Sequence, residues 1–156
     1  MIYLDTSVAL AHLLAEDRRP PDGFWNQSIV SSRLLEYELW TRIHARNLGR
    51  SHGEMVRSLI GRVALLELVP TVLARALESF PVPVRTLDAL HLASMDFLRS
   101  HGQEIRLATY DEKLGHAAKT LGISVRTLQR KLKAWRMPML ALQTHVPQHG
   151  MYSARH

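Results

Sequence analysis

The chain has 156 residues, of which 46% are hydrophobic and 22% charged, and its formal net charge is +6 at pH 7. These values are typical of one globular domain with a buried core, and the absence of cysteine excludes disulfide bonds and thiolate metal sites. We find neither a secretory leader nor an apolar run long enough to cross a bilayer, so we expect a cytoplasmic protein without a membrane partner.

Short apolar segments alternate along the chain with longer segments of helical periodicity. Apolar residues recur three or four positions apart between Leu34 and Leu48, and again between Leu87 and Leu98, which predicts helices there. Short buried strands that alternate with helices favour an α/β fold, a three-layer α/β/α sandwich around a short, mainly parallel sheet. The predicted strands are Ile2–Leu4, Ile29–Val30, Leu66–Val69, Ile105–Ala108 and Ile123–Val125.

Four acids occupy positions that the predicted fold brings to one edge of the sheet. Asp5 and Asp111 each come just after a predicted strand, and the carboxyl ends of parallel strands line the ligand crevice of such sheets. Glu38 lies in the helix that follows the second strand, and Asp88 opens the helix after the segment FPVPV. We therefore expect these four carboxylates to converge on one rim.

Each acid also has a purely structural explanation. Asp5 suits the N-cap of the helix that follows it, and Asp88 suits a helix N-terminus electrostatically. Glu38 could be an exposed helical acid like Glu36, and Asp111 a turn residue. For each acid alone both explanations stay open.

A convergence of carboxylates predicts a bound cation. Gathered carboxylates repel one another, burial raises the cost of their charge, and a divalent cation removes that cost. Oxygen ligands without cysteine indicate Mg²⁺ or Mn²⁺, as in phosphodiester and phosphoryl-transfer sites. Other chemistries lack their motifs: GxGxxG, GxxxxGK[ST], GxSxG and HExxH are absent, and Ser7 stands where an Asp-x-Asp phosphotransferase needs its second aspartate.

Four segments resemble those of a known family. LDTS, SSRLLEYE, RTLDALHLA and LATYDEKLGHAAKTLGI follow one another as in the PIN-domain ribonucleases, and they are most similar to the VapC toxins of toxin–antitoxin pairs. The resemblance covers residues 1–125. It implies a PIN-like α/β sandwich and a Mg²⁺-dependent endoribonuclease that cleaves RNA with a metal-activated water.

The resemblance also assigns roles to the four acids. The catalytic quartet of the family corresponds to Asp5, Glu38, Asp88 and Asp111 in this sequence. Asp5, Asp88 and Asp111 are the expected ligands of Mg²⁺, with Mn²⁺ as a substitute, and Glu38 is expected to orient or deprotonate the attacking water. Which acid is the general base, and whether one or two ions bind, stay open.

Further residues and partners follow from the same resemblance. The supporting hydroxyls correspond to Thr6, Ser7 and Thr109, and His116 stands where some relatives carry a fifth acid. His91, three residues after Asp88, is expected to be a core residue or a neighbour of the site rather than a ligand. The expected partners are an RNA substrate and a cognate antitoxin, in a homodimer or a toxin–antitoxin hetero-oligomer. The RNA target and cut site are not evident from the sequence.

The C-terminal segment 126–156 carries all the excess positive charge. It contains six Lys and Arg and no acid, whereas residues 1–125 contain 14 of each sign. Such asymmetry favours an anionic partner, although a solvated basic tail would have the same composition. We predict a basic amphipathic helix and tail appended to the 1–125 domain. The candidate nucleic-acid contacts are Arg126, Arg130, Lys131 and Lys133.

An alternative function arises from the same region. GISVRTLQRKLKAWRM resembles the end of a Fis-type helix-turn-helix, which would make residues 117–136 a nucleic-acid-binding regulator. Its first helix would be HAAKTLG, a segment that the PIN resemblance already uses, and the preceding support helix is missing. We therefore favour the nuclease.

Overall fold

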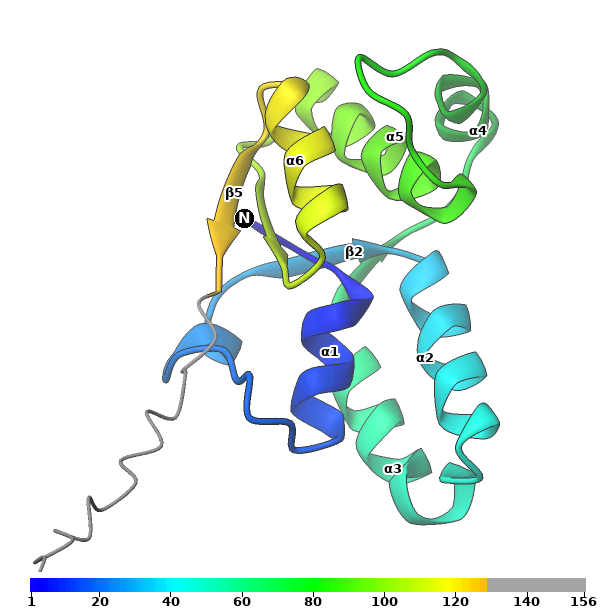
Figure 1. The fold of residues 1–156 in the computed structure, drawn as a ribbon, viewed down its shortest axis with the longest axis vertical. Helices are drawn as coiled ribbons and strands as arrows, with labels where there is room; N and C mark the ends of the chain where they lie inside the picture. The colour runs from blue at the N-terminus through cyan, green and yellow to red at the C-terminus, as the bar shows by residue number, and fades with distance from the viewer. Residues whose placement is uncertain (129–156) are drawn as a thin grey trace, which may run out of the picture.

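The computed structural model describes residues 1–128, and it has an α/β architecture in which strands and helices alternate (Figure 1). Five strands form one sheet, helices connect them, and a 3₁₀ turn at Phe24–Asn26 precedes the second strand. In chain order the elements are β1 Ile2–Leu4, α1 Thr6–Leu13, β2 Ile29–Ser32, α2 Leu34–Ala45, α3 Gly49–Ile60, β3 Ala64–Leu66, α4 Pro70–Leu77, α5 Thr86–Ser100, β4 Arg106–Thr109, α6 Glu112–Thr120 and β5 Ser124–Thr127.

The sheet is parallel throughout, in the order β3-β2-β1-β4-β5. Tyr3 in the central strand is in register with Val30 on one side and Leu107 on the other. The chain adds β2 and β3 to one side of β1 and then crosses to add β4 and β5 to the other. The point where strand order reverses therefore lies between β1 and β4, which is where α/β sheets form ligand crevices.

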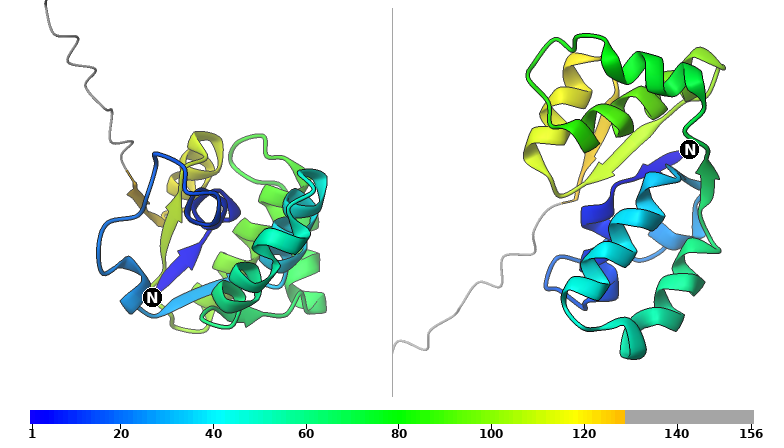
Figure 2. Two further views of the ribbon diagram at one scale, coloured as in Figure 1. Left: turned by 90° about the horizontal axis from the view of Figure 1, so that it is seen from below. Right: turned by 90° about the vertical axis from the view of Figure 1, so that its right-hand side faces the viewer.

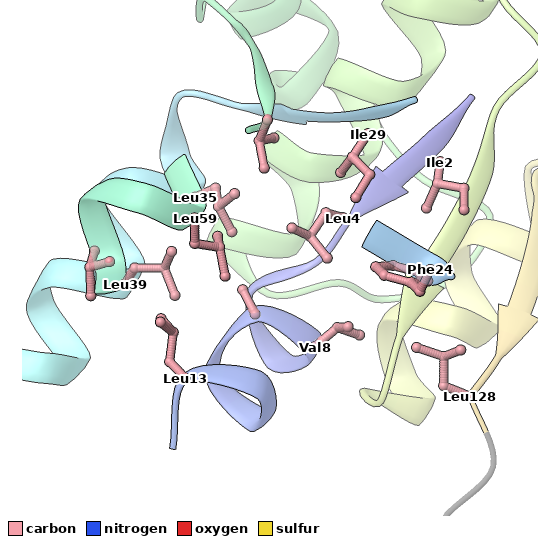
Figure 3. Close-up of a cluster of buried hydrophobic side chains, with 14 of the residues drawn as sticks. Ile2, Leu4, Val8, Leu13, Phe24, Ile29, Leu35, Leu39, Leu59 and Leu128 are labelled. Atoms are coloured by element: carbon pink, nitrogen blue, oxygen red, sulfur yellow. The ribbon is translucent and has the colours of Figure 1, made fainter. Parts of the chain in front are cut away.

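Helices cover both faces of the sheet, and the side chains of β1 alternate between them (Figures 1 and 2). Ile2 and Leu4 belong to a core cluster with residues of α1, α2 and α3, which Figure 3 shows around Leu4. Tyr3 points into a second cluster with residues of α5 and α6. The period of two along the strand thus divides the core into two layers, and the expected sandwich is confirmed.

Two of the predicted boundaries are wrong by three residues, and the other predicted ends agree to within two residues. The third strand is Ala64–Leu66 rather than Leu66–Val69, because Val69 is the N-cap of α4 and Pro70, which lacks an N–H, begins that helix. The periodicity expected through Leu48 ends at Ala45, because Asn47 adopts a positive φ of 56° before α3 begins.

The C-terminal prediction is only partly within the described residues. Arg126 and Thr127 complete β5 and pair with β4, so the helix expected from residue 126 does not begin there. The remainder of the predicted tail, 129–156, lies outside the described residues. In the part of the chain that the structure describes, no helix has the length and apolarity needed to cross a membrane.

Because Leu4 is fully buried between the sheet and α1–α3, Leu4→Ala should lower the free energy of unfolding by about 2–5 kcal/mol. Leu77→Ala is the matched control, since Leu77 is 89% exposed and its truncation opens no cavity. Urea denaturation of both variants measures the difference. Equal destabilisation by the two would contradict the assigned core.

Candidate active site

A pocket of about 450 Å³ lies at the carboxyl edge of the sheet and contains all the predicted acids. The sequence prediction that these side chains converge is therefore confirmed, although their residues are widely separated along the chain. Arginines from two elements share the walls with them. The lining includes Asp5, Glu38, Asp88 and Asp111, the hydroxyl residues Thr6 and Ser7, and Arg42, Arg46 and Arg85.

The aspartates that follow strands cap the next helices as well as lining the pocket. Asp5 is the N-cap of α1 and accepts a hydrogen bond from the Ser7 amide at 3.2 Å. Asp111 is the N-cap of α6, and its Oδ1 accepts from the amides of Lys113 and Leu114 at 2.9 and 3.1 Å. The structural explanation is therefore confirmed for Asp5 and Asp111, and capping fixes each carboxylate where a strand ends and the pocket begins.

Hydroxyl groups hold Asp5 in place. Thr109 Oγ1 donates to Asp5 Oδ2 at 2.8 Å, and Ser7 Oγ donates to the same oxygen. Each hydroxyl also accepts a backbone N–H at 2.9 Å, Thr109 from Asp111 and Ser7 from Tyr110. Because Asp5 and Thr109 are only 6% and 4% exposed, this network joins the ends of β1 and β4 rigidly.

Arg85 joins two acids of the pocket. Its Nε donates to Asp88 Oδ2 at 2.8 Å, and its Nη2 donates to Asp88 Oδ1 at 3.3 Å and to Asp111 Oδ2 at 2.5 Å. Burial alone would raise the pKa of Asp111, but the Leu114 N–H and the Arg85 guanidinium outweigh it and lower the pKa. The hydrogen bonds to both aspartates raise the pKa of Arg85 itself. Sequence reasoning missed this residue, although it precedes Asp88 by three positions on the same helix entrance.

A buried histidine supports Glu38. His91 is 1% exposed, and its Nε2 lies 2.8 Å from Glu38 Oε2 while its Nδ1 lies 2.9 Å from the Tyr3 hydroxyl. Thr6 Oγ1 donates to the same Glu38 oxygen at 2.5 Å. The Tyr3 oxygen in turn accepts the Ser32 N–H at 3.2 Å. His91 is thus the satisfied core residue that the sequence suggests, and it also contacts the site.

The charges of this pair stabilise each other. Burial opposes the charge on both groups. For His91, the electrostatic influence of Tyr3 and the hydrogen bond and charge of Glu38 outweigh it and raise the pKa to about 10. For Glu38, the hydrogen bonds from His91 and Thr6 outweigh it and lower the pKa.

The donor set suits a hard divalent cation, since it consists of carboxylate and hydroxyl oxygens in one pocket. Within residues 1–128, however, no three His, Cys, Asp or Glu side chains stand close enough to share an ion as they are placed. Each acid is instead satisfied by a neighbour: Asp5 by hydroxyls, Glu38 by His91, and Asp88 and Asp111 by Arg85. Protein cations and hydroxyls therefore already offset repulsion that was expected to be removed by a divalent cation.

Other predicted residues lie near the pocket or beyond the described chain. His116 lines a neighbouring cavity of about 420 Å³, and Asp111 lies in the wall of both cavities. Arg126 lies on β5, with its Nη1 3.5 Å from Gln27 Oε1. The other three candidate nucleic-acid contacts, Arg130, Lys131 and Lys133, lie outside the described residues.

The helix-turn-helix alternative does not match the described part of its segment. α6 buries Leu114, Ala117 and Ala118 in the core, as the nuclease interpretation requires. In a Fis-type motif a turn at GIS (122–124) would lead into the DNA-reading helix, but residues 125–127 belong to the strand β5 and pair with β4.

Comparison with known proteins places these features in context. The PIN-domain family model matches residues 2–120, and a model described as bacterial regulatory protein, Fis family, matches residues 114–135. Ribonuclease VapC46 of Mycobacterium tuberculosis is 37% identical over 131 residues, which cover 80% of this chain and 95% of that protein. Ribonuclease VapC35 of the same species is 31% identical with the same coverage, and Ribonuclease VapC47 is 28% identical over 129 residues.

The His91–Glu38 pair predicts a pH-dependent stability. A raised pKa means that the stabilisation is complete below the ordinary value of 6.5 and is lost as the pH rises through about 10. His91→Gln keeps a donor near Glu38 but cannot carry the charge. The difference in free energy of unfolding between wild type and His91→Gln should therefore shrink from about pH 6.5 to about pH 10.

Urea denaturation across that pH range measures this difference. The exposed His101, substituted as His101→Gln, is the control and should show no such trend. A difference between wild type and His91→Gln that stayed constant with pH would mean that His91 is not charged in the folded protein.

Proposed function

The chain belongs to the PIN-domain family and to its VapC type, and from this membership we propose that it is an endoribonuclease toxin that hydrolyses RNA phosphodiester bonds with Mg²⁺ or Mn²⁺. The observation that carries the proposal is the single pocket in which four carboxylates from distant segments lie beside three arginines. Acids suit a catalytic cation, and arginines suit a polyanionic substrate. The coverage of 95% of Ribonuclease VapC46 supports the transfer of a whole-domain activity.

We assign the cation to Asp5, Asp88 and Asp111. When bound, it would supply the Lewis acidity that lowers the pKa of a water and stabilises the leaving oxygen. Asp88 and Asp111 now share the guanidinium of Arg85, whose side chain is 62% exposed. A long exposed side chain can withdraw into solvent, so Arg85 can release both aspartates to an ion.

Glu38 is the residue we assign to the attacking water. Its Oε2 receives the hydrogen bonds from Thr6 and His91, and among the described residues its Oε1 has no hydrogen-bond partner. The lowered pKa keeps the side chain ionised near neutral pH. Glu38 can therefore accept a hydrogen bond from water, and then its proton, at Oε1.

The hydroxyls of Ser7 and Thr109 position Asp5 rather than react. Both donate to Oδ2, which leaves Oδ1 of Asp5 without a hydrogen bond from the described residues. This fixes the carboxylate plane before any ligand arrives, and preorganisation of that kind reduces the cost of binding.

The proposal includes partners. We infer a cognate antitoxin that blocks the pocket, an assembly as a homodimer or a toxin–antitoxin hetero-oligomer, and action on RNA in the cytoplasm. These inferences rest on the VapC type, and the open acidic pocket is the surface that an inhibitor has to cover.

Removing a catalytic carboxylate should abolish cleavage and preserve the fold. Asp5→Asn and Glu38→Gln are nearly isosteric, and each should lower the rate of RNA cleavage by at least about 100-fold, as is typical for loss of general acid–base or ligand groups. Purified full-length protein incubated with total RNA and Mg²⁺, followed by sequencing of the new RNA ends, measures the rate and locates the cuts.

Glu36→Gln is the matched control, since Glu36 lies on the same helix but pairs with Arg33 and does not line the pocket. It should cleave like wild type, and EDTA should stop both. A folded Asp5→Asn protein that cut RNA at the wild-type rate would refute the assignment, and so would cleavage that persisted in EDTA.

A further inference from the structure

Two arginines in the acidic pocket have no acidic partner among residues 1–128. Arg42 and Arg46 line the same cavity as the four carboxylates, yet within the described residues neither forms an ion pair or a side-chain hydrogen bond. Both are exposed. The charge of Arg42 reaches the site, because it contributes to the lowered pKa of Glu38.

Neighbouring arginines behave differently. Arg85 is shared between two aspartates of the pocket, and Arg33, just before α2, pairs with Glu36 and Glu67. The pocket therefore contains one arginine that neutralises its acids by contact and two whose guanidinium groups bind no acid of the described chain. Guanidinium groups that are not engaged by neighbouring acids are available to a polyanionic substrate.

The spacing of Arg42 and Arg46 places them in one row with Glu38 along α2. Glu38, Arg42 and Arg46 are four residues apart along α2 and its C-cap, so they lie on one face of the helix at intervals of about 6 Å. α1 and α2 lie side by side below the sheet in Figure 1, and Leu10 of α1 lines the same pocket. The cavity thus extends from the acids along the face of α2 that carries the arginines.

An extended nucleic-acid strand carries one negative charge per nucleotide, so a strand that enters an acidic pocket needs positive charge beside the acids. Arginine binds phosphate with two parallel N–H donors. The order Glu38, Arg42, Arg46 offers the reacting group first and then two phosphate-binding groups at successive positions.

We propose that Arg42 and Arg46 form a phosphate-binding track for the RNA strand next to the cleaved bond. Successive phosphodiester groups on one side of the scissile phosphate would contact Arg42 first and Arg46 next. This inference rests on the proposed ribonuclease function, and it assigns substrate-binding residues that the resemblance to the family does not name.

A structural alternative gives a different result in the same experiment. Cations near the C-terminus of a helix stabilise it through the helix dipole, and Arg46 is the C-cap of α2. If this were their only role, Arg42→Gln and Arg46→Gln would lower the melting temperature and leave RNA binding unchanged.

Binding of a short, fluorescein-labelled single-stranded RNA of mixed sequence tests the track. The full-length chain carries Asp5→Asn so that the probe stays intact, and Mg²⁺ is present throughout. Arg42→Gln and Arg46→Gln should each raise the Kd roughly tenfold, the low end for a charge-assisted hydrogen bond. Each should also reduce the salt dependence of log Kd by about 0.7.

Arg106→Gln is the charge-matched control. Arg106 is exposed and begins β4 in register with Ile2, at the amino end of the strands and far from the pocket edge. In this variant the Kd and the salt dependence of log Kd should equal those of the Asp5→Asn protein without a further substitution. If Arg106→Gln weakened RNA binding as much as Arg42→Gln and Arg46→Gln, the effect would come from the net charge of the protein, and the proposed track would be wrong.

Methylphosphonate probes locate the contacts. Each phosphate of the RNA is replaced in turn by the neutral methylphosphonate. Binding of each probe is then measured with and without Arg42→Gln, and with and without Arg46→Gln, as double-mutant cycles. The effect of Arg46→Gln should vanish at one position, and that of Arg42→Gln at the adjacent position nearer the cut. An effect that survives every replacement would contradict direct phosphate contact.

The outcomes also separate the track from the nuclease. If the wild-type protein cut no RNA but bound the probe through Arg42 and Arg46, the proposed track would stand and the proposed nuclease function would be wrong. If the protein cut RNA and neither Arg42→Gln nor Arg46→Gln changed the Kd for the probe, the proposed nuclease function would stand and the proposed track would be wrong.

Discussion

Repulsion between carboxylates gathered in one pocket is the constraint on which the rest of the site depends. Asp5 and Asp88 are almost fully buried, and charge in such surroundings has to be offset. The structure offsets it in three ways, with hydroxyls on Asp5, with the His91 pair on Glu38, and with Arg85 between Asp88 and Asp111. An acid pocket can therefore persist in a folded chain before any ion or substrate binds.

The topology creates that constraint. The order of strands reverses between β1 and β4, so the residues after these strands meet at one edge, and Thr109 bonds across the junction to Asp5. The same edge receives Glu38 from α2 and Asp88 from the first turn of α5. Arg42 and Arg46 continue along α2 from Glu38, so one helix carries both the proposed catalytic acid and the proposed phosphate-binding residues.

Much of this arrangement could be predicted from the sequence, for physical reasons. Asp5 and Asp111 end short apolar segments, and the rule that parallel strands share a carboxyl edge brings them together. Glu38 and Asp88 were expected at the same edge from their places in the predicted helices, and the family resemblance then suggested roles for them. Arg85 was missed although Asp88 is only three residues away, because its second partner, Asp111, is set by tertiary packing, as is the contact of Tyr3 with His91. The third strand was misplaced because Leu66, Leu68 and Val69 are apolar residues around the single acid Glu67, and it is the start of α4 at Pro70 that excludes Val69 from the strand.

The central proposal is that Asp5, Asp88 and Asp111 form one divalent-cation site, in which Arg85 occupies Asp88 and Asp111 until the ion binds. A titration of the full-length protein with Mn²⁺, followed by the loss of the electron paramagnetic resonance signal of the free ion, tests it most directly. The account predicts saturable binding by wild type, tighter binding by Arg85→Gln and loss of binding by Asp88→Asn. If the concentration of free Mn²⁺ fell neither with the wild-type protein nor with Arg85→Gln, the proposed cation site would be contradicted.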